Sequence, residues 1–366
     1  EPHFLENARG IDPSLFFDED GTCYYIGTHP NPAGCQYDGD WYIWIQELDI
    51  ENMKLVGEVH NVWNGAMRNI IWPEGPHLYK IGEYYYIMHA EGGTGPDHAV
   101  TVCRSKNVYG PYENNFCNPI LTHRHLGRKY PIRYVGHADL VKTINDEWYM
   151  VMLAVRPLEG YTTMGRETFL ARVEWENDWP VVNPGVGRLT DTVEINLPKW
   201  TAYTAESNEY VFSTMGQLPP EFMVLRNADK SHYSLEKGKG LLMLFDTHTL
   251  KEQASPSYLA FRQKHHHFIA KALLDVSNLS EDKRAGIAYV QNNLYNLRVE
   301  VNGKMAEVIL CEKGTDRRVI SMPLQGSNPL EVSLEVDGLS AAVIIEGQKS
   351  PEVDIRTLST EAAGGF

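Results

Sequence analysis

Two carboxylates and an imidazole stand at the same point of a pattern that the sequence repeats three times. Asp12, Glu74 and His137 each head the first apolar strand of one repeat. Charged groups are costly to bury, and a converging trio of this kind suits general acid and base chemistry on a neutral substrate. Each residue alone has an ordinary structural explanation, in a turn, at a solvated end or in a core. Their recurrence favours a shared functional site.

The elements that position these residues are a strand, a tight turn and a second strand in each repeat. With Leu15, Leu78 and Leu140 taken as equivalent, the repeats are 63 and 62 residues apart. A third and a shorter fourth apolar run follow each hairpin, and four strands in each repeat predict the blades of a β-propeller. A string of unrelated hairpins would show the same strands but not the constant spacing.

The repeat ends near residue 195, which leaves about three blades of a ring that normally has four to eight. We therefore expect residues 1–195 to form an incomplete propeller. Beyond them, shorter strands alternate with charged turns and predict a second domain over residues 196–366. This pattern is typical of a β-sandwich with one solvent-facing side, so the whole chain is predicted to be all-β.

The composition excludes some classes of partner. The chain of 366 residues has a net charge of −15, which argues against nucleic-acid and anionic-membrane partners because phosphate binding needs clustered Lys and Arg. No window approaches the roughly 18 apolar residues of a membrane-spanning helix. The five cysteines form no CxxC pair, so free thiols are expected, as in a reducing compartment such as the cytoplasm. The oligomeric state stays open, a homo-oligomer included.

Longer strings around these residues resemble the successive signatures of glycoside hydrolase family 43, a family of β-xylosidases and α-L-arabinofuranosidases. The second domain is similar to the C-terminal sandwich of that family, so the resemblance spans essentially the whole chain. It implies a five-bladed β-propeller followed by a concanavalin-like β-sandwich. The matching strings are residues 10–21, 73–79, 90–94, 98–101, 122–125, 136–140 and 165–169 in the first domain, and 255–259, 262–263, 285–286 and 291–292 in the second.

The resemblance implies a role for each carboxylate. Glu74 would be the general acid that protonates the glycosidic oxygen, and Asp12 would orient Glu74 and raise its pKa. A second negative charge nearby disfavours ionisation of an acid, which agrees with this pairing.

The resemblance also implies inversion, in which a base activates a water roughly 6.5 to 9.5 Å from the acid. In the family this base is an Asp on a blade that precedes the first repeat seen here. We therefore expect that the chain lacks the base, stops short of the last strand of the sandwich and is nearly inactive by itself.

Further residues are implied to contact the substrate or a metal. Arg156 matches an arginine that binds sugar hydroxyls, where its fork of donors suits paired oxygens. Ile11, Thr94 and Phe366 are the other substrate-binding positions. His137 would lie at the bottom of the propeller channel, near a calcium ion (Ca2+) held through waters, because calcium prefers oxygen ligands.

Together these features predict an exo-acting, inverting glycosidase that releases xylose or arabinose from xylo-oligosaccharides or arabinoxylan. The alternative is a non-catalytic carbohydrate-binding protein, which would need Arg156 and aromatic side chains but not the acid pair. A protein-interaction scaffold would instead show exposed patches without convergent carboxylates. The histidines of the loop after the second repeat, His123 and His125, have two interpretations: they approach the substrate, or they hold the loop by hydrogen bonds.

Overall fold

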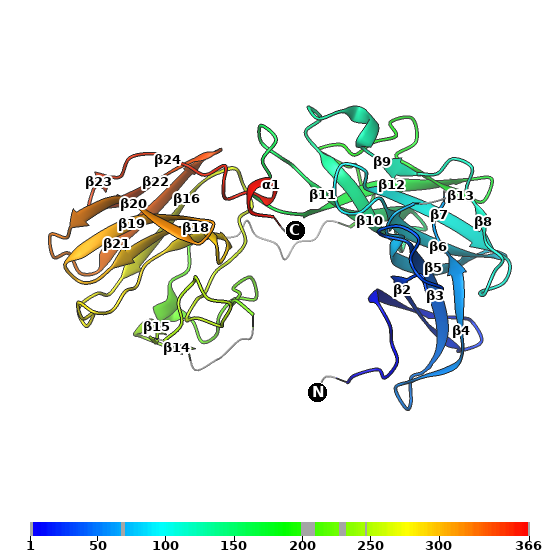
Figure 1. The fold of residues 1–366 in the computed structure, drawn as a ribbon, viewed down its shortest axis with the longest axis horizontal. Helices are drawn as coiled ribbons and strands as arrows, with labels where there is room; N and C mark the ends of the chain where they lie inside the picture. Colours follow the sequence, from blue (N-terminus) through cyan, green and yellow to red (C-terminus); the bar gives the residue numbers. More distant parts are fainter. Residues whose placement is uncertain (1–2, 67–69, 199–208, 227–231, 246, 365–366) are drawn as a thin grey trace. The chain divides into compact units, whose positions relative to one another are not determined.

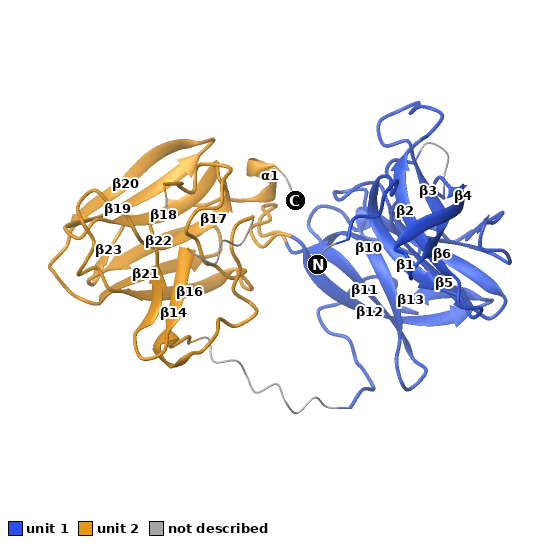
Figure 2. Ribbon diagram, turned by 90° about the horizontal axis from the view of Figure 1, so that it is seen from below, with its two compact units in different colours: residues 1–156, 166–198 blue, residues 157–165, 199–366 orange. Residues whose placement is uncertain are grey.

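The computed structural model describes residues 3–66, 70–198, 209–226, 232–245 and 247–364 (Figure 1). Its contacts divide the chain into two compact units. The first unit holds residues 1–156 and 166–198, and the second holds residues 157–165 and 199–366 (Figure 2). Strands form nearly all of the regular structure, which confirms the all-β prediction. Within these described ranges, no helix is both long and apolar enough to cross a membrane.

Three antiparallel sheets make up the first unit, and each contains one of the predicted repeats; we call them blades 1 to 3. The first strand of each blade, which heads the repeat, lies at one edge of its sheet. Blade 1 is β1 (Ile11–Phe17), β2 (Cys23–Pro30), β3 (Trp41–Asp49) and β4 (Lys54–Trp63). Blade 2 is β5 (Glu74–Ile81), β6 (Tyr84–Glu91), β7 (Ala99–Ser105) and β8 (Glu113–Asn114), with β9 (Leu121–Thr122) also paired to β7. Blade 3 is β10 (Arg133–Lys142), β11 (Trp148–Val155), β12 (Glu167–Glu176) and β13 (Trp179–Val182).

The blades pack on one another through apolar side chains. Ile26 of β2 and Ile87 of β6 are fully buried and belong to a core shared by blades 1 and 2. Met88, the next residue of β6, belongs instead to the core shared with blade 3, because successive side chains of a strand point to opposite faces. The strands of a blade that has a neighbour on each side are therefore apolar on both faces, unlike strands with one face in water.

A β-bulge interrupts the first strand of every blade at the same place. Each bulge adds one residue relative to the second strand and begins with a residue in the left-handed backbone region. The φ angle is 52° at Asp12, 56° at Gly75 and 52° at His137. The bulges lie between Ile11 and Ser14 in β1, between Glu74 and His77 in β5, and between Gly136 and Asp139 in β10.

This register corrects the equivalence that the repeat pattern predicts for Asp12, Glu74 and His137. Asp12 and His137 are equivalent, but the matching residue of blade 2 is Gly75, and Glu74 lies one position earlier. This offset can be seen in the spacing of the sequence. Asp12 and His137 stand three residues before the leucine of their strand, whereas Glu74 stands four residues before Leu78.

Polar side chains join the first strands of neighbouring blades. Asp18, at the end of β1, accepts a hydrogen bond of 2.6 Å from the Tyr85 hydroxyl and lies 3.2 Å from Nζ of Lys80. Between blades 2 and 3, the Tyr79 hydroxyl donates to the Asp139 carboxylate. These contacts fix the edge strands on which the predicted site residues stand.

The second unit is a sandwich of two antiparallel sheets, as predicted. Leu297 and Val308 from one sheet and Val332 and Val343 from the other share a single buried core. One sheet consists of β16 (His267–Leu274), β21 (Leu330–Asp337), β22 (Ser340–Ile345) and β23 (Gln348–Lys349), with β24 (Val353–Asp354) paired to β22. The other consists of β17 (Ala288–Asn292), β18 (Tyr295–Val301), β19 (Met305–Glu312) and β20 (Thr315–Pro323), and a separate hairpin is formed by β14 (Tyr233–Glu236) and β15 (Gly240–Met243).

Residues 157–165 connect β11 to β12 of blade 3, yet they group with the second unit. Thr162 donates from its backbone N–H and its hydroxyl to the two carboxylate oxygens of Glu361, at 2.6 and 2.7 Å. Its carbonyl accepts a bond of 3.0 Å from the N–H of Thr360, where helix α1 (Thr360–Ala363) begins. The sequence pattern gives no sign of this excursion, because the residues that hold it are about two hundred positions away.

The buried core predicts how two isoleucines of the first unit differ. Ile87 is fully buried between blades 1 and 2, whereas Ile144, in a turn of blade 3, is 85% exposed. Ile87→Ala should lower the free energy of unfolding by about 2 to 5 kcal/mol, because it leaves a cavity. Ile144→Ala should change it by less than about 0.5 kcal/mol. Urea unfolding followed by tryptophan fluorescence compares them, and equal losses would contradict the assignment of the core.

Candidate active site

Glu74 is the first residue of β5 and sits half-buried at the edge of blade 2. Burial, followed by the negative charge of Asp12, raises the pKa of the Glu74 carboxyl from 4.5 to about 7. No hydrogen-bond donor among the described residues holds this carboxyl. A carboxylic acid that keeps its proton near neutral pH can donate it to an oxygen atom of a bound molecule.

Asp12 faces the backbone next to Glu74. Its Oδ2 accepts a hydrogen bond of 3.2 Å from the N–H of Gly75, the residue that follows Glu74. A hydrogen bond to a carboxylate favours the charged form, so the two carboxyl groups have different surroundings. Asp12 has a donor and Glu74 has none among the described residues.

His137 heads the equivalent position of blade 3, and its ring lies against blade 2. A methyl group placed on Gly75 would come within 2.4 Å of Nε2 of His137, so the imidazole occupies the side-chain space of this glycine. Burial lowers the pKa of His137, and the charge of Asp12 opposes that shift. The structure therefore brings Asp12, Glu74 and His137 together around Gly75.

Two residues near this trio were not singled out from the sequence. The positive charge of Arg166 contributes to the lowered pKa of His137, so Arg166 lies close to the trio. His98 is almost fully buried; its Nδ1 donates to the Tyr134 carbonyl at 2.9 Å, and its Nε2 has no hydrogen-bond partner among the described residues. Burial lowers the pKa of His98 to about 4, so the ring is neutral. Both residues lie in strings quoted for the resemblance, but no local pattern shows that they face the trio.

An ion pair places Arg156, which directly follows β11 of blade 3. Its Nε and Nη2 donate to the two oxygens of Glu167, at 3.0 and 2.6 Å. The side chain is 42% exposed, and the donors of Nη1 are not used by Glu167. The fork that was predicted to bind sugar hydroxyls is thus partly engaged by a carboxylate, which fixes its orientation.

The other predicted substrate-binding positions differ in how the structure describes them. Ile11 begins β1, is 45% exposed and lies level with Glu74 in the register of the blades. Thr94 is half-buried in the turn after β6, next to Gly93, whose Cα packs against the Trp72 ring. Phe366 lies outside the described residues.

His123 has a structural role, which is the second of the two interpretations for its loop; the interpretations for Arg124 and His125 stay open. Its Nδ1 donates to the Ile132 carbonyl at 2.7 Å, and its Nε2 accepts from the Leu189 N–H at 3.0 Å. The ring is almost fully buried, so both nitrogens are used to hold the loop.

The residues around His137 do not form a direct metal site. Within the described ranges, no group of three or more His, Cys, Asp or Glu side chains is placed to hold an ion. A calcium ion prefers six to eight oxygen ligands, and the imidazole of His137 supplies none. The residues present thus do not fit a calcium ion held directly by the protein, and a water-mediated ion stays a prediction.

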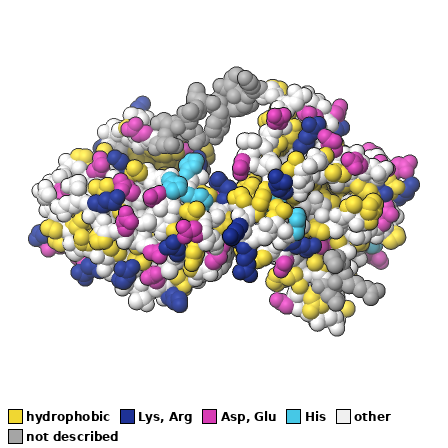
Figure 3. All heavy atoms as spheres, turned by 90° about the horizontal axis from the view of Figure 1, so that it is seen from above, with side chains coloured by type: hydrophobic (Ala, Val, Ile, Leu, Met, Phe, Trp, Pro, Cys, Tyr) yellow, Lys and Arg dark blue, Asp and Glu magenta, His cyan; other side chains and the backbone are white. Residues whose placement is uncertain are grey.

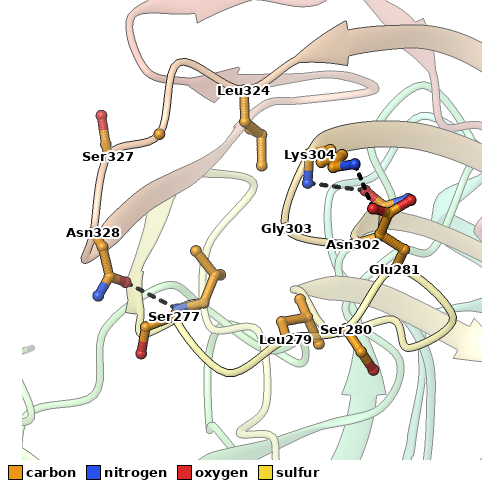
Figure 4. Close-up of a pocket in the computed structure, with 12 residues that line it drawn as sticks. Ser277, Leu279, Ser280, Glu281, Asn302, Gly303, Lys304, Leu324, Ser327 and Asn328 are labelled. Atoms are coloured by element: carbon orange, nitrogen blue, oxygen red, sulfur yellow. Dashed lines mark hydrogen bonds and ion pairs between the residues drawn. The ribbon is translucent and has the colours of Figure 1, made fainter.

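A hollow of about 510 Å³ lies elsewhere, among loops of the sandwich (Figure 4). Lys304 pairs there with Glu281, and Oδ1 of Asn328 accepts a bond of 3.0 Å from the Val276 N–H. These polar groups bind one another, and none of the predicted site residues lines the hollow. The face drawn in Figure 3 shows Lys and Arg scattered among Asp and Glu rather than gathered into a basic surface.

Comparisons with known proteins bear on both units. A family model described as Glycosyl hydrolases family 43 matches residues 1–180, and one described as Beta xylosidase C-terminal Concanavalin A-like domain matches residues 210–366. The chain is 45% identical over 383 residues to a xylosidase/arabinosidase of Butyrivibrio fibrisolvens, covering 100% of this chain and 73% of that protein. It is 32% identical to a beta-xylosidase of Bacillus subtilis, covering 94% of this chain and 65% of that protein. The crystal structure of the GH43 BlXynB protein from Bacillus licheniformis matches with a TM-score of 0.87 and 31% identity, covering 99% of this chain and 69% of that one.

The raised pKa of Glu74 predicts a pH dependence of stability. Because the folded pKa of about 7 lies above the ordinary 4.5, the folded state keeps a proton that the unfolded state releases between these values. The contribution of Glu74 is fully present below about pH 4.5 and is lost as the pH rises through 7. Glu74→Gln does not titrate, so its melting temperature minus that of the wild type should increase from pH 4.5 to 7.

Thermal melting across this pH range provides the measurement. Glu58→Gln, at an exposed position of β4, serves as the control and should show a constant difference. A constant difference for Glu74→Gln as well would show that the carboxyl has an ordinary pKa.

Proposed function

Because this chain belongs to glycosyl hydrolase family 43, we propose that it carries the acid half of an exo-acting, inverting glycosidase site. The proposed substrates are xylo-oligosaccharides or arabinoxylan, and the products are xylose or arabinose. The chain spans 73% of its Butyrivibrio relative and 65% of its Bacillus subtilis relative, so the activity of the whole protein is part of this proposal. The observation that carries it is the pKa of about 7 for Glu74 beside Asp12.

In the proposed reaction, Glu74 donates its proton to the glycosidic oxygen as the bond from that oxygen to the anomeric carbon breaks. The electron pair of the bond leaves with the oxygen, which becomes a hydroxyl. A water attacks the anomeric carbon from the opposite face, and this attack inverts the configuration. The water gives its proton to a base. We propose no residue of this chain as that base. Burial, followed by the negative charge of Asp12, keeps Glu74 protonated until the substrate is bound, because both oppose ionisation of the acid.

Arg156 is proposed to bind hydroxyl groups of the terminal sugar. Its ion pair with Glu167 supports this role, because a guanidinium held at two donors loses little rotamer freedom when the others bind a ligand. A neutral sugar also suits an acidic chain, since it is not repelled by the net charge of −15.

We also propose that the three described blades belong to a propeller of five blades. Phe16 packs into the core between blades 1 and 2, so its neighbours in β1 point away from blade 2. Leu15 and Phe17 are 50% and 58% exposed on that other face. An apolar face on an edge blade supports packing against a further blade of the same kind.

The role of Glu74 as acid predicts an effect that depends on the leaving group. Glu74→Gln cannot donate a proton, so turnover of xylobiose or arabino-oligosaccharides by the active enzyme should fall by about 10² to 10⁴-fold. A 4-nitrophenyl glycoside, whose leaving group needs little protonation, should lose much less. Steady-state kinetics on both substrates tests this, and unchanged turnover of xylobiose would refute the assignment.

The pairing with Asp12 predicts a shift of the pH profile. Activity that needs protonated Glu74 should decline as the pH rises through about 7. In Asp12→Asn the negative charge is gone, so the pKa of Glu74 falls and this alkaline limb should move to lower pH. The pH dependence of kcat/KM on xylobiose is the measurement, and a limb that stays in place would contradict the proposed influence of Asp12.

A further inference from the structure

Two glycines in the first strands of blades 2 and 3 each lie against the ring of a histidine from the other blade. A methyl group on Gly75 would lie 2.4, 2.6 and 2.7 Å from Nε2, Cδ2 and Cε1 of His137. A methyl group on Gly136 would lie 2.4 Å from both Nε2 and Cε1 of His98. Real carbon contacts are not this short, so each ring occupies the space where a side chain would otherwise be.

The first of these contacts lies at a point that the register defines. Gly75 is the residue of blade 2 that corresponds to Asp12 in blade 1 and His137 in blade 3. All three have φ between 52° and 56°, so the backbone adopts the same left-handed conformation at this point of each blade. Blade 2 has a glycine there because the ring of His137 fills the place of its side chain.

Gly75 is held from a second direction by Asp12. The carboxylate of Asp12 accepts the N–H of Gly75 at 3.2 Å, and the peptide group that carries this N–H also belongs to Glu74. The ring of His137 therefore contacts one side of a turn whose amide is bound by Asp12. Movement of this turn would move the Glu74 carboxyl with it.

We propose that His137 is a positioning residue for Glu74: its imidazole fills the space left by Gly75 and locks the left-handed turn that holds the acid beside Asp12. This inference rests on the proposed function of Glu74 as the acid. It assigns the ring of His137 a steric task that does not require a bound metal ion.

The test is a set of variants in the active enzyme. Gly75→Ala places a methyl group into the His137 ring and should displace the acid, lowering kcat on xylobiose by about 100-fold, the loss that a misplacement of 1 Å can cause. His137→Ala should also lower kcat on xylobiose, because the turn loses its support. The 4-nitrophenyl glycoside should be affected much less in both, since it needs little help from the acid. The double variant Gly75→Ala/His137→Ala has no clash, so it should be no slower than His137→Ala.

Gly82→Ala is the matched control. Gly82 lies in the turn directly after the same strand, at φ 61°, but no atom lies within 4 Å of a methyl group placed there. It carries the backbone strain of Gly75→Ala without the clash, and it should keep kcat within about twofold. Melting temperatures establish that all variants are folded, and each measurement is repeated with added calcium and with a chelator.

The outcomes separate this inference from the proposed function. Three results would overturn the steric role. The losses in kcat of the two single variants could multiply in the double variant, they could be equal on both substrates, or they could vanish when calcium is added. If Glu74→Gln retains full turnover of xylobiose, the proposed function itself is wrong. If Glu74→Gln is inactive on xylobiose while His137→Ala is fully active, only the positioning role fails.

Discussion

Two carboxyl groups that lie close together and partly out of water resist being ionised at the same time, and the candidate active site of the first unit depends on this constraint. Blade 1 presents Asp12 and blade 2 presents Glu74, so the pair exists only because two separate sheets are packed together. The backbone N–H of Gly75 donates to Asp12, which ties the carboxylate of blade 1 to the strand that carries Glu74. Glu74 differs from Asp12 in that burial, followed by the charge of Asp12, raises its pKa to about 7.

The geometry around this pair depends on a backbone conformation that is costly for most residues. A residue other than glycine in the left-handed region costs on the order of 1 to 3 kcal/mol and persists only where the surroundings compensate for it. Asp12 and His137 are both in this region, at the same bulge of their blades. The repeat of this bulge in all three blades indicates that it belongs to the blade itself, and that the residues placed on it have diverged.

The sequence was sufficient for the features that repeat or that alternate locally. The hairpins, the three blades and the sandwich follow from spacing and strand pattern, and the three titratable residues follow from their approximate place in the repeat. It was insufficient for contacts between distant segments. Glu74 lies one position before the residue of blade 2 that corresponds to Asp12, and the sequence shows this only as a spacing of four residues, rather than three, to the leucine of the strand. The nearness of His98 to His137 depends on how blades 2 and 3 pack. The ion pair that engages Arg156 depends on the pairing of β11 with β12 within blade 3.

The excursion of residues 157–165 gives the two units an unusual covalent relation. The chain passes from one unit to the other three times, after Arg156, before Arg166 and after Pro198. A terminal module that had been joined by simple gene fusion would be connected once. Deleting the sandwich would leave Thr162 without the carboxylate that binds it, and swapping the sandwich for that of another protein would require a matching loop in blade 3. We therefore expect that loop and that sandwich to have changed together during evolution.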